Sequence, residues 1–345
     1  MAGIGKAHLR ASDQALLRVE DLVVEFPAGR GQRVHAVTDV NLDVLRGETL
    51  GLVGESGCGK STTGKAIMQL PAPTSGSVVF DGTDLTGLEG TALREVRTRL
   101  QMIFQDPISS LNPRRRIEDI VAEGIDIWKK ASGADRDRQV DDMLLTVGMD
   151  PRVVRGRRPH QFSGGQCQRI SIARAVITEP QLIVCDEPVS ALDVSVQAQI
   201  LNLLEDMKAQ YGLTLIFIAH DLAVVKNISD RVAVMYLGRL CEVGDPDVLY
   251  QAPAHPYTAA LLSAIPVPDP SVRPDQRQTL GGEIPSPLSP PSGCRFRTRC
   301  PRADEQCVDE VPEMVQIGDD HFVACHHPLE PGEAETMVTV SGGIS

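Results

Sequence analysis

Residues 54–61 read Gly-Glu-Ser-Gly-Cys-Gly-Lys-Ser and match the pattern GxxxxGK[ST]. A short apolar strand at 50–53 precedes them, and residues 60–70 have helical character. Glycines at these spacings let backbone N–H groups turn inward around a phosphate, and the start of the helix adds positive partial charge. We therefore expect a nucleotide site in which Lys60 reaches the β- and γ-phosphates and Ser61 helps to hold Mg²⁺. The residues assigned to it are Gly54, Glu55, Ser56, Gly57, Cys58, Gly59, Lys60, Ser61 and Thr62.

A second motif supplies carboxylates. Residues 182–187 read Leu-Ile-Val-Cys-Asp-Glu, which predicts a buried strand that ends in two acidic side chains. Asp186 suits a Mg²⁺ shell, and Glu187 suits the polarisation of an attacking water. Taken alone, such a pair is also typical of a solvated strand end. With a phosphate-binding loop upstream, we expect hydrolysis of the nucleotide.

A third motif distinguishes among the families of nucleotide hydrolases. Residues 162–169 read Phe-Ser-Gly-Gly-Gln-Cys-Gln-Arg and open a predicted helix just before the acidic strand. They resemble the LSGGQ signature of the ATP-binding-cassette (ABC) family, with Phe162 in place of leucine at a packing position. The chain has no Asn-Lys-x-Asp motif, which argues against a small GTPase. The resemblance covers residues 17–250, and its other marks follow in order: Gln105, Ser190-Ala191-Leu192-Asp193 and His220.

The ABC resemblance implies an α/β fold: a P-loop ATPase core with a RecA-like parallel sheet, an antiparallel β subdomain and a helical subdomain. It also implies that two cassettes pair head to tail, so that ATP lies between the P-loop of one and the signature of the other. The signature residues acting in trans are Ser163, Gly164, Gly165 and Gln166. The catalytic residues that the resemblance implies are Glu187, His220 and Gln105. It implies Mg²⁺ ligands at Ser61, Gln105 and Asp186. Phe26 is expected to stack on adenine, with a place in the core as the alternative.

The composition changes after residue 250. Residues 255–258 read His-Pro-Tyr-Thr, and eight prolines lie between residues 266 and 291. This extension resembles the ATP-binding subunits of bacterial oligopeptide/dipeptide importers, a group that also handles nickel. The expected domains are the core in two parts (15–105 and 166–255), a helical subdomain (106–165), a Pro-rich linker (256–292), a small loop-rich module (293–330) and a flexible tail (331–345).

The module at 293–330 carries four cysteines: Cys294, Cys300, Cys307 and Cys325. Four thiolates suit a tetrahedral zinc or a [4Fe–4S] cluster, and clustered cysteines without an export signal favour a metal over disulfides. Zinc usually takes close Cys pairs, so the wide spacing and the Cys300-Pro301 step favour iron–sulfur, as the family resemblance also implies. His326 and His327 are potential zinc ligands, so zinc remains the alternative metal. We expect Arg295, Arg297 and Arg299 to offset the charge of such a centre.

The charge composition limits the classes of molecule that this chain is expected to bind. With 34 Lys+Arg against 46 Asp+Glu the net charge is −12, which argues against nucleic acid as the main partner. We expect no membrane-spanning segment and no export signal. The resulting hypothesis is a peripheral ATPase on the cytoplasmic face of the cell membrane that powers peptide import. Its partners are a second cassette (a copy or a sibling), two permease subunits and an extracytoplasmic solute-binding protein. The alternatives are a soluble ABC ATPase of translation or DNA repair, an importer of nickel or another solute, and a redox- or metal-sensing regulator.

Overall fold

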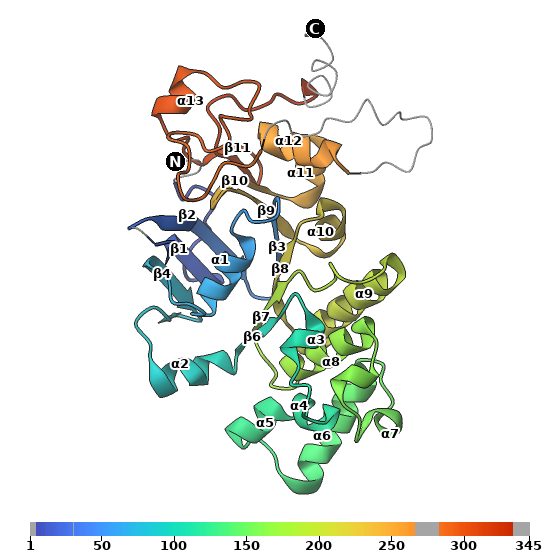
Figure 1. The fold of residues 1–345 in the computed structure, drawn as a ribbon. Coiled ribbons are helices and arrows are strands. Elements are labelled where there is room, and N and C mark those ends of the chain that lie inside the picture. The colour runs from blue at the N-terminus through green and yellow to red at the C-terminus, as the bar shows by residue number, and fades with distance from the viewer. Residues whose placement is uncertain (1–4, 30, 266–282, 334–345) are drawn as a thin grey trace, which may run out of the picture. The chain divides into compact units, whose positions relative to one another are not determined.

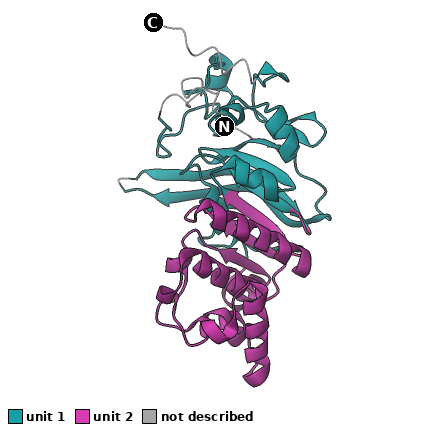
Figure 2. Ribbon diagram, turned by 90° about the vertical axis from the view of Figure 1, so that its right-hand side faces the viewer, with its two compact units in different colours: residues 1–45, 49–87, 219–345 teal, residues 46–48, 88–218 magenta. Residues whose placement is uncertain are grey.

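The computed structural model describes residues 5–29, 31–265 and 283–333 (Figure 1). It divides into two compact units (Figure 2). Unit 1 comprises residues 1–45, 49–87 and 219–345, and unit 2 comprises residues 46–48 and 88–218. Part of the expected linker, 266–282, and most of the expected tail, 334–345, lie outside the described residues.

Unit 1 contains the expected antiparallel β subdomain. Its strands pair in the order β2-β1-β4-β5, and β1 alternates between buried and more exposed side chains because one of its faces covers the core. The bounds of these strands are β1 (Ala15–Pro27), β2 (Arg33–Leu45), β4 (Ser75–Phe80) and β5 (Thr83–Asp84).

A second set of strands in unit 1 carries the P-loop. Strand β3 (Thr49–Val53) is buried throughout and runs parallel to β9 (Arg231–Tyr236), as continuous apolar strands of a parallel sheet do. Strand β10 (Arg239–Gly244) then pairs antiparallel with β9. The helices of unit 1 are α1 (Lys60–Ile67), α10 (Leu222–Ile228), α11 (Pro246–Gln251), α12 (Pro256–Ser263) and α13 (Glu305–Asp309).

The cysteine-rich segment has more regular structure than the sequence indicated. Strands β11 (Val315–Gly318) and β12 (His321–Val323) form a hairpin, and β12 pairs with β10 through Glu242 and Val323. Phe322 and Val323 are buried. The strands are too short to produce a recognisable alternation; the residues of β12 are buried, whereas those of β11 are exposed. The segment therefore shares the core of unit 1.

Unit 2 holds three parallel strands in the order β6-β7-β8, with Leu100 opposite Leu182 and Leu182 opposite Thr214. These strands are β6 (Leu100–Ile103), β7 (Leu182–Asp186) and β8 (Thr214–Ala219). The helices are α2 (Gly90–Arg97), α3 (Pro107–Ser110), α4 (Ile117–Val121), α5 (Glu123–Trp128), α6 (Gly133–Thr146), α7 (Pro151–Val154), η1 (Pro159–Gln161), α8 (Gly164–Val176) and α9 (Val194–Tyr211).

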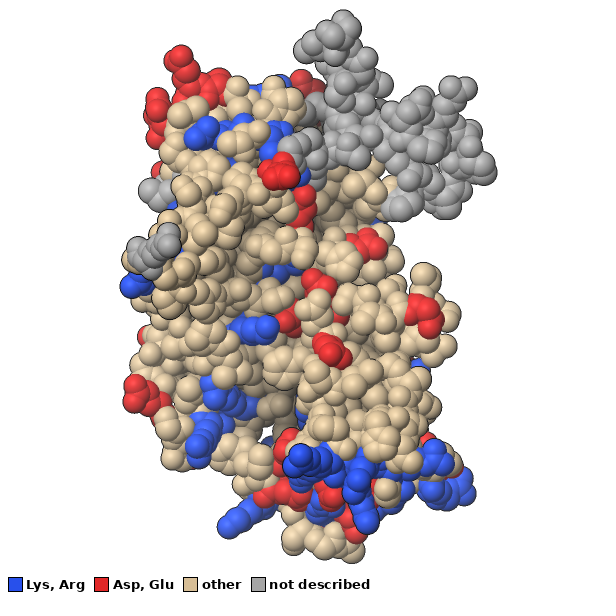
Figure 3. Space-filling model, in the orientation of Figure 1, with Lys and Arg blue, Asp and Glu red and all other residues tan. Residues whose placement is uncertain are grey.

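Helices α4 to α7 carry many charges, and Figure 3 shows basic and acidic side chains intermixed in the lower part of the view. Arg136 pairs with Asp126 at 2.6 Å, and Arg155 pairs with Asp141 at 2.7 Å. These arginines stabilise the helical segment by bridging its own carboxylates. Among the described helices, none is long and apolar enough to cross a membrane.

Candidate functional site

The P-loop of unit 1 wraps around the Lys60 ammonium. Lys60 is buried, and its Nζ donates to the carbonyls of Gly54 at 2.7 Å and Glu55 at 3.0 Å. Gly54 and Gly59 have φ values of 151° and 109°, which side-chain-bearing residues rarely adopt. A Cβ on Gly59 would lie 2.4 Å from the carbonyl oxygen of Ala36. Glycine is therefore required at both positions for the loop to close around the lysine.

Cys58 fills the interior of this loop. Its Sγ lies 3.8 Å from Lys60 Nζ, and burial raises the pKa of its thiol. Cys58 is therefore a neutral packing group at neutral pH. Ser61 and Thr62 lie in the first turn of α1, where both are half-buried.

Two further predicted residues belong to unit 1. Phe26, near the end of β1, is 37 % exposed, so the core alternative considered for it is wrong. His220 is exposed and directly follows β8. The next residue, Asp221, caps α10 by accepting a hydrogen bond from the N–H of Ala223 at 2.8 Å.

In unit 2 the structure brings Gln105 and Glu187 together. Gln105 Nε2 donates to Glu187 Oε2 at 3.1 Å. Glu187 has φ 47°, a left-handed conformation that is uncommon outside glycine. Its N–H donates to the Ile218 carbonyl at 3.0 Å, and its carbonyl accepts from Ser190 Oγ at 3.1 Å. These bonds fix the backbone of Glu187 at the end of β7, whose last residue, Asp186, is buried.

The signature residues begin helix α8. Ser163 accepts from the N–H of Gln166 at 3.4 Å, and Gln166 Oε1 accepts from the N–H of Ser163 at 3.0 Å, which is a capping box. A Cβ on Gly165 would lie 2.6 Å from Cγ1 of Val196 in α9, whereas one on Gly164 would meet Leu192 at an ordinary 3.6 Å. Gly165 therefore lets α8 approach α9 closely.

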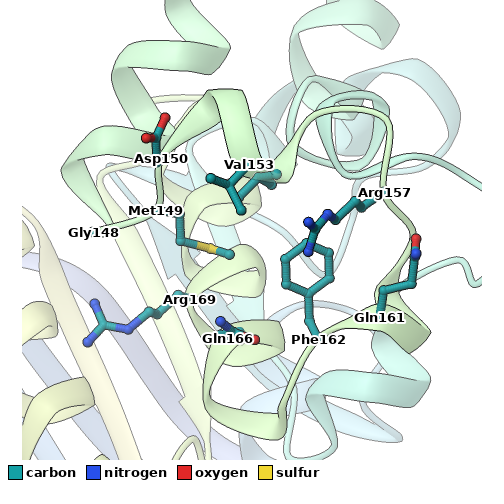
Figure 4. A pocket seen from close by; sticks show the side chains of 10 residues that line it. Gly148, Met149, Asp150, Val153, Arg157, Gln161, Phe162, Gln166 and Arg169 are labelled. Atoms are coloured by element: carbon teal, nitrogen blue, oxygen red, sulfur yellow. The ribbon is translucent and has the colours of Figure 1, made fainter.

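A pocket of about 480 Å³ lies beside the signature helix in unit 2. Figure 4 shows Met149, Val153 and Phe162 lining it, with Arg157 beside the Phe162 ring. Phe162, which replaces the leucine of the family signature, is half-buried and forms part of this wall.

The four clustered cysteines of unit 1 lie in one neighbourhood. Burial, together with the charges of the other cysteines in the cluster, raises the pKa of Cys300 to about 11 and that of Cys325 to about 12. Cys294 and Cys307 are buried and also have raised pKa values. Without a metal these thiols are neutral at pH 7, so metal binding must release protons.

The distances between these sulfur atoms bear on the choice between zinc and an iron–sulfur cluster. Tetrahedral zinc, with Zn–S of about 2.3 Å, requires sulfurs roughly 3.8 Å apart. Within the part of the chain that the structure describes, no three of the four sulfurs lie within 4.8 Å of one another; the three-ligand set at that spacing is Asp304, Cys307 and His327. A cluster whose cysteines bind different irons spaces its ligands more widely. The close spacing therefore favours the mixed set over the four cysteines for a single zinc ion.

All three arginines expected to face the cysteine centre have other partners, and Arg297 donates through Nε to the carbonyl of Ser292 at 3.0 Å. Arg295 donates to the carbonyl of Leu237, and also to Thr38 Oγ1 at 2.9 Å. Arg299 forms an ion pair with Glu55 in the P-loop. Arg295 and Arg299 therefore connect the cysteine-rich segment to other parts of unit 1, and their effect on the charge of a cluster stays a prediction. Sequence reasoning missed these contacts, and also the buried Cys241 near Cys294, because nothing in a linear spacing signals partners so distant in the chain.

Comparisons with known proteins agree with this geometry. Residues 37–190 match the ABC transporter family, and residues 241–307 match the family described as oligopeptide/dipeptide transporter, C-terminal region. The oligopeptide transport ATP-binding protein OppF of Salmonella typhimurium is 52 % identical over 322 residues, which cover 90 % of this chain and 96 % of that protein. The putative oligopeptide transport ATP-binding protein YkfD of Bacillus subtilis is 51 % identical over 314 residues, covering 90 % and 95 %.

Solved structures show the same fold. The ATP-binding cassette MJ0796, in a dimeric post-hydrolysis state bound to ADP and phosphate, aligns with a TM-score of 0.61 at 28 % identity. The alignment covers 67 % of this chain and 98 % of that one. CbiO1 of Clostridium perfringens, part of the transporter complex CbiONQ, gives 0.60 at 27 % identity and covers 69 % and 91 %.

Proposed function

The chain belongs to the ABC transporter family of ATPases, and we propose that it is the ATP-hydrolysing subunit of an importer that takes up oligopeptides or dipeptides. The observation that carries this proposal is the length of the match: the relatives named for oligopeptide transport are similar over 90 % of the chain. The match includes the C-terminal region at 241–307, which lies beyond the part shared with other cassettes.

Hydrolysis needs a loop that binds the phosphates and polar side chains that activate water. The P-loop, residues 54–62, cradles the phosphates, with Lys60 leaving its loop carbonyls for the β- and γ-phosphates, and Phe26 stacks on the adenine. Glu187 polarises the attacking water, and His220 contacts the γ-phosphate. The hydrogen bond between Gln105 and Glu187 supports this role, because it orients the carboxylate before the nucleotide arrives.

Magnesium is the metal of this reaction. Ser61, Gln105 and Asp186 offer a hydroxyl, an amide oxygen and a carboxylate, the hard oxygen donors that Mg²⁺ prefers. Gln105 donates to Glu187 through Nε2, which leaves its amide oxygen for the metal. When bound, the ion neutralises charge on the β- and γ-phosphates.

Two cassettes combine head to tail in the working ATPase. The capping box of Ser163 and Gln166 orients the first turn of α8, whose N–H groups suit the γ-phosphate of ATP bound by the other cassette. Gly164 and Gly165 keep this approach free of side chains. The dimeric state of the MJ0796 structures supports the arrangement.

The cysteine centre is structural. Cys294, Cys300, Cys307 and Cys325 hold a [4Fe–4S] cluster, for which four thiolates are the required number of protein ligands. Zinc is the alternative, with Asp304, Cys307 and His327 as its ligands. Either centre would supply a cross-link that a segment of this size needs in a reducing compartment.

The subunit acts at the cytoplasmic face of the cell membrane. Its partners are a second cassette, two permease subunits that dock on the helical segment after Gln105, and an extracytoplasmic solute-binding protein. These partners are those that an importer of this family requires, and they explain how a chain whose described helices do not cross a membrane drives transport.

Uptake measurements test the function. Cells that lack this chain should lose uptake of labelled oligopeptides; the wild-type gene should restore it and the Glu187→Gln gene should not. Loss of nickel uptake with normal peptide uptake would favour the other importer class. Normal uptake of both, with a defect in translation or DNA repair, would contradict the importer function.

A further inference from the structure

The cysteine-rich segment contacts the P-loop within unit 1 through one arginine. The Arg299 guanidinium forms a bidentate ion pair with the Glu55 carboxylate, with Nη1 2.7 Å from Oε2 and Nη2 3.0 Å from Oε1. The Arg299 side chain is 3 % exposed and that of Glu55 is 21 % exposed. A two-point, largely buried pair of this kind is strong and fixes geometry, unlike a surface ion pair.

A second group from the C-terminal third holds the backbone of the same residue. The N–H of Glu55 donates to the Tyr257 hydroxyl at 2.8 Å. Tyr257 is buried and packs against the rings of Tyr236, at 4.8 Å, and Phe296, at 5.4 Å. Arg299 also donates to the Tyr236 hydroxyl at 3.4 Å. The amide and the carboxylate of Glu55 are therefore both held from outside the cassette core.

Glu55 in turn contacts the lysine that binds phosphate. Its carbonyl accepts from Lys60 Nζ at 3.0 Å, beside the 2.7 Å bond from Lys60 to Gly54. Any displacement of Glu55 moves this carbonyl and the neighbouring N–H groups that form the phosphate cradle. Without Arg299, the Glu55 carboxylate would also be an uncompensated negative charge beside a polyphosphate site.

We propose that Arg299 is a positioning residue for the ATP-binding loop, which it holds through Glu55, so that nucleotide affinity depends on the folded cysteine-rich segment. This role rests on the assignment of residues 54–62 to ATP. It gives the C-terminal extension a direct effect on the ATPase. It requires no particular metal, only that residues around Cys300 keep Arg299 in place.

Binding of ATP to the full-length chain, measured by calorimetry, tests this role. Arg299→Ala should raise the Kd of ATP about tenfold, the order of one strong charge-assisted pair, and should raise KM while leaving kcat at saturating ATP nearly unchanged. Arg299→Lys should recover part of the affinity. In the Arg299→Ala background, Glu55→Gln should cause no second tenfold loss, because both changes remove the same ion pair.

Arg302→Ala is the matched control. Arg302 lies in the same segment and pairs with Glu333 at 2.9 Å, an ion pair away from the P-loop. It should leave the Kd of ATP unchanged. An equal loss in Arg302→Ala, a wild-type Kd in Arg299→Ala, or a second tenfold loss on adding Glu55→Gln would each overturn the proposal. If Arg299→Ala does not fold, a wild-type Kd in Arg299→Gln overturns it instead.

Failure of this role is distinguishable from failure of the proposed function. Wild-type chain that binds no ATP contradicts the ATP site itself and this role with it. Wild-type chain that binds ATP with no dependence on Arg299 contradicts the positioning role alone.

Discussion

Gln105 Nε2 lies 3.1 Å from Glu187 Oε2, although 82 positions separate the two residues in the chain. The contact joins the end of β6 to the end of β7, which are parallel neighbours in unit 2. Residues at the carboxyl ends of adjacent parallel strands meet at the same edge of a sheet. The amide and the carboxylate therefore belong to one polar site, and its chemistry can be tested residue by residue.

Glu187→Gln should retain ATP affinity and lose turnover by a factor of about 10² or more, because a general base acts in the transition state and not in nucleotide binding. The trapped nucleotide should also hold the dimer closed. Single-turnover kinetics and size-exclusion chromatography with ATP measure both effects. Lys60→Ala is the contrast, since it should weaken binding itself. Near-normal turnover in Glu187→Gln would exclude this residue as the base.

A mixture of two inactive chains should recover activity if the site is composite. Lys60→Ala disables the P-loop of one chain, and Ser163→Arg disables the signature of the other. A mixed dimer keeps one intact interface, so an equal mixture should reach up to about a quarter of wild-type ATPase activity if the chain pairs with itself. Each variant alone provides the control. No recovery at any ratio would contradict self-pairing in this geometry.

Gly165→Ala should destabilise unit 2 by roughly 1–3 kcal/mol, because the new Cβ would lie 2.6 Å from the stiff side chain of Val196. Gly164→Ala is the matched control, since its Cβ meets Leu192 at 3.6 Å. Urea unfolding monitored by Trp128 fluorescence compares them. Val196→Ala in the Gly165→Ala background should restore part of the loss. Equal stability of the two glycine variants would contradict the packing argument.

Protein purified without oxygen should be brown, with broad absorption near ~400 nm and about four irons per chain, if the cysteines hold a [4Fe–4S] cluster. Cys294→Ala should abolish the colour and His327→Ala should not. Colourless protein with one zinc, lost in His327→Ala, would place the metal at Asp304, Cys307 and His327 instead. Four freely alkylated thiols and no metal would rule out both centres.

Acid should destabilise unit 1 through His255. Burial lowers the pKa of this histidine from 6.5 to about 4, against a smaller opposing effect of Glu242, and its Nδ1 accepts from the N–H of Tyr257 at 3.0 Å. His321, the other nearby ionisable group, bonds to Glu242 at 2.7 Å.

The unfolded chain takes up this proton near pH 6.5 and the folded chain only near pH 4, so stability is complete above pH 6.5 and falls as the pH falls to 4. The loss due to His255 should be about 2 kcal/mol between pH 7.5 and 5. Urea unfolding of wild type and His255→Gln at both pH values measures it. An identical pH dependence in the two proteins would contradict this origin.

The sequence alone determined the features that depend on local chemistry. The P-loop glycines, the cap at Ser163 and the apolar strand before Asp186 are each contained in a few consecutive residues, because backbone conformation and strand burial follow from neighbouring side chains. Helix α9 likewise begins at Val194, where Asp193 caps it, and ends at Tyr211, just before Gly212.

Only the tertiary structure decided which distant residues meet. Arg299 and Glu55 are 244 positions apart, and the hairpin of β11 and β12 joins the sheet through β10. Such contacts depend on how long segments pack, and the residues involved carry no local signal of their partner. That is why the sequence placed Arg299 beside a metal centre held by the cysteines, whereas in the folded chain it pairs with Glu55 of the P-loop.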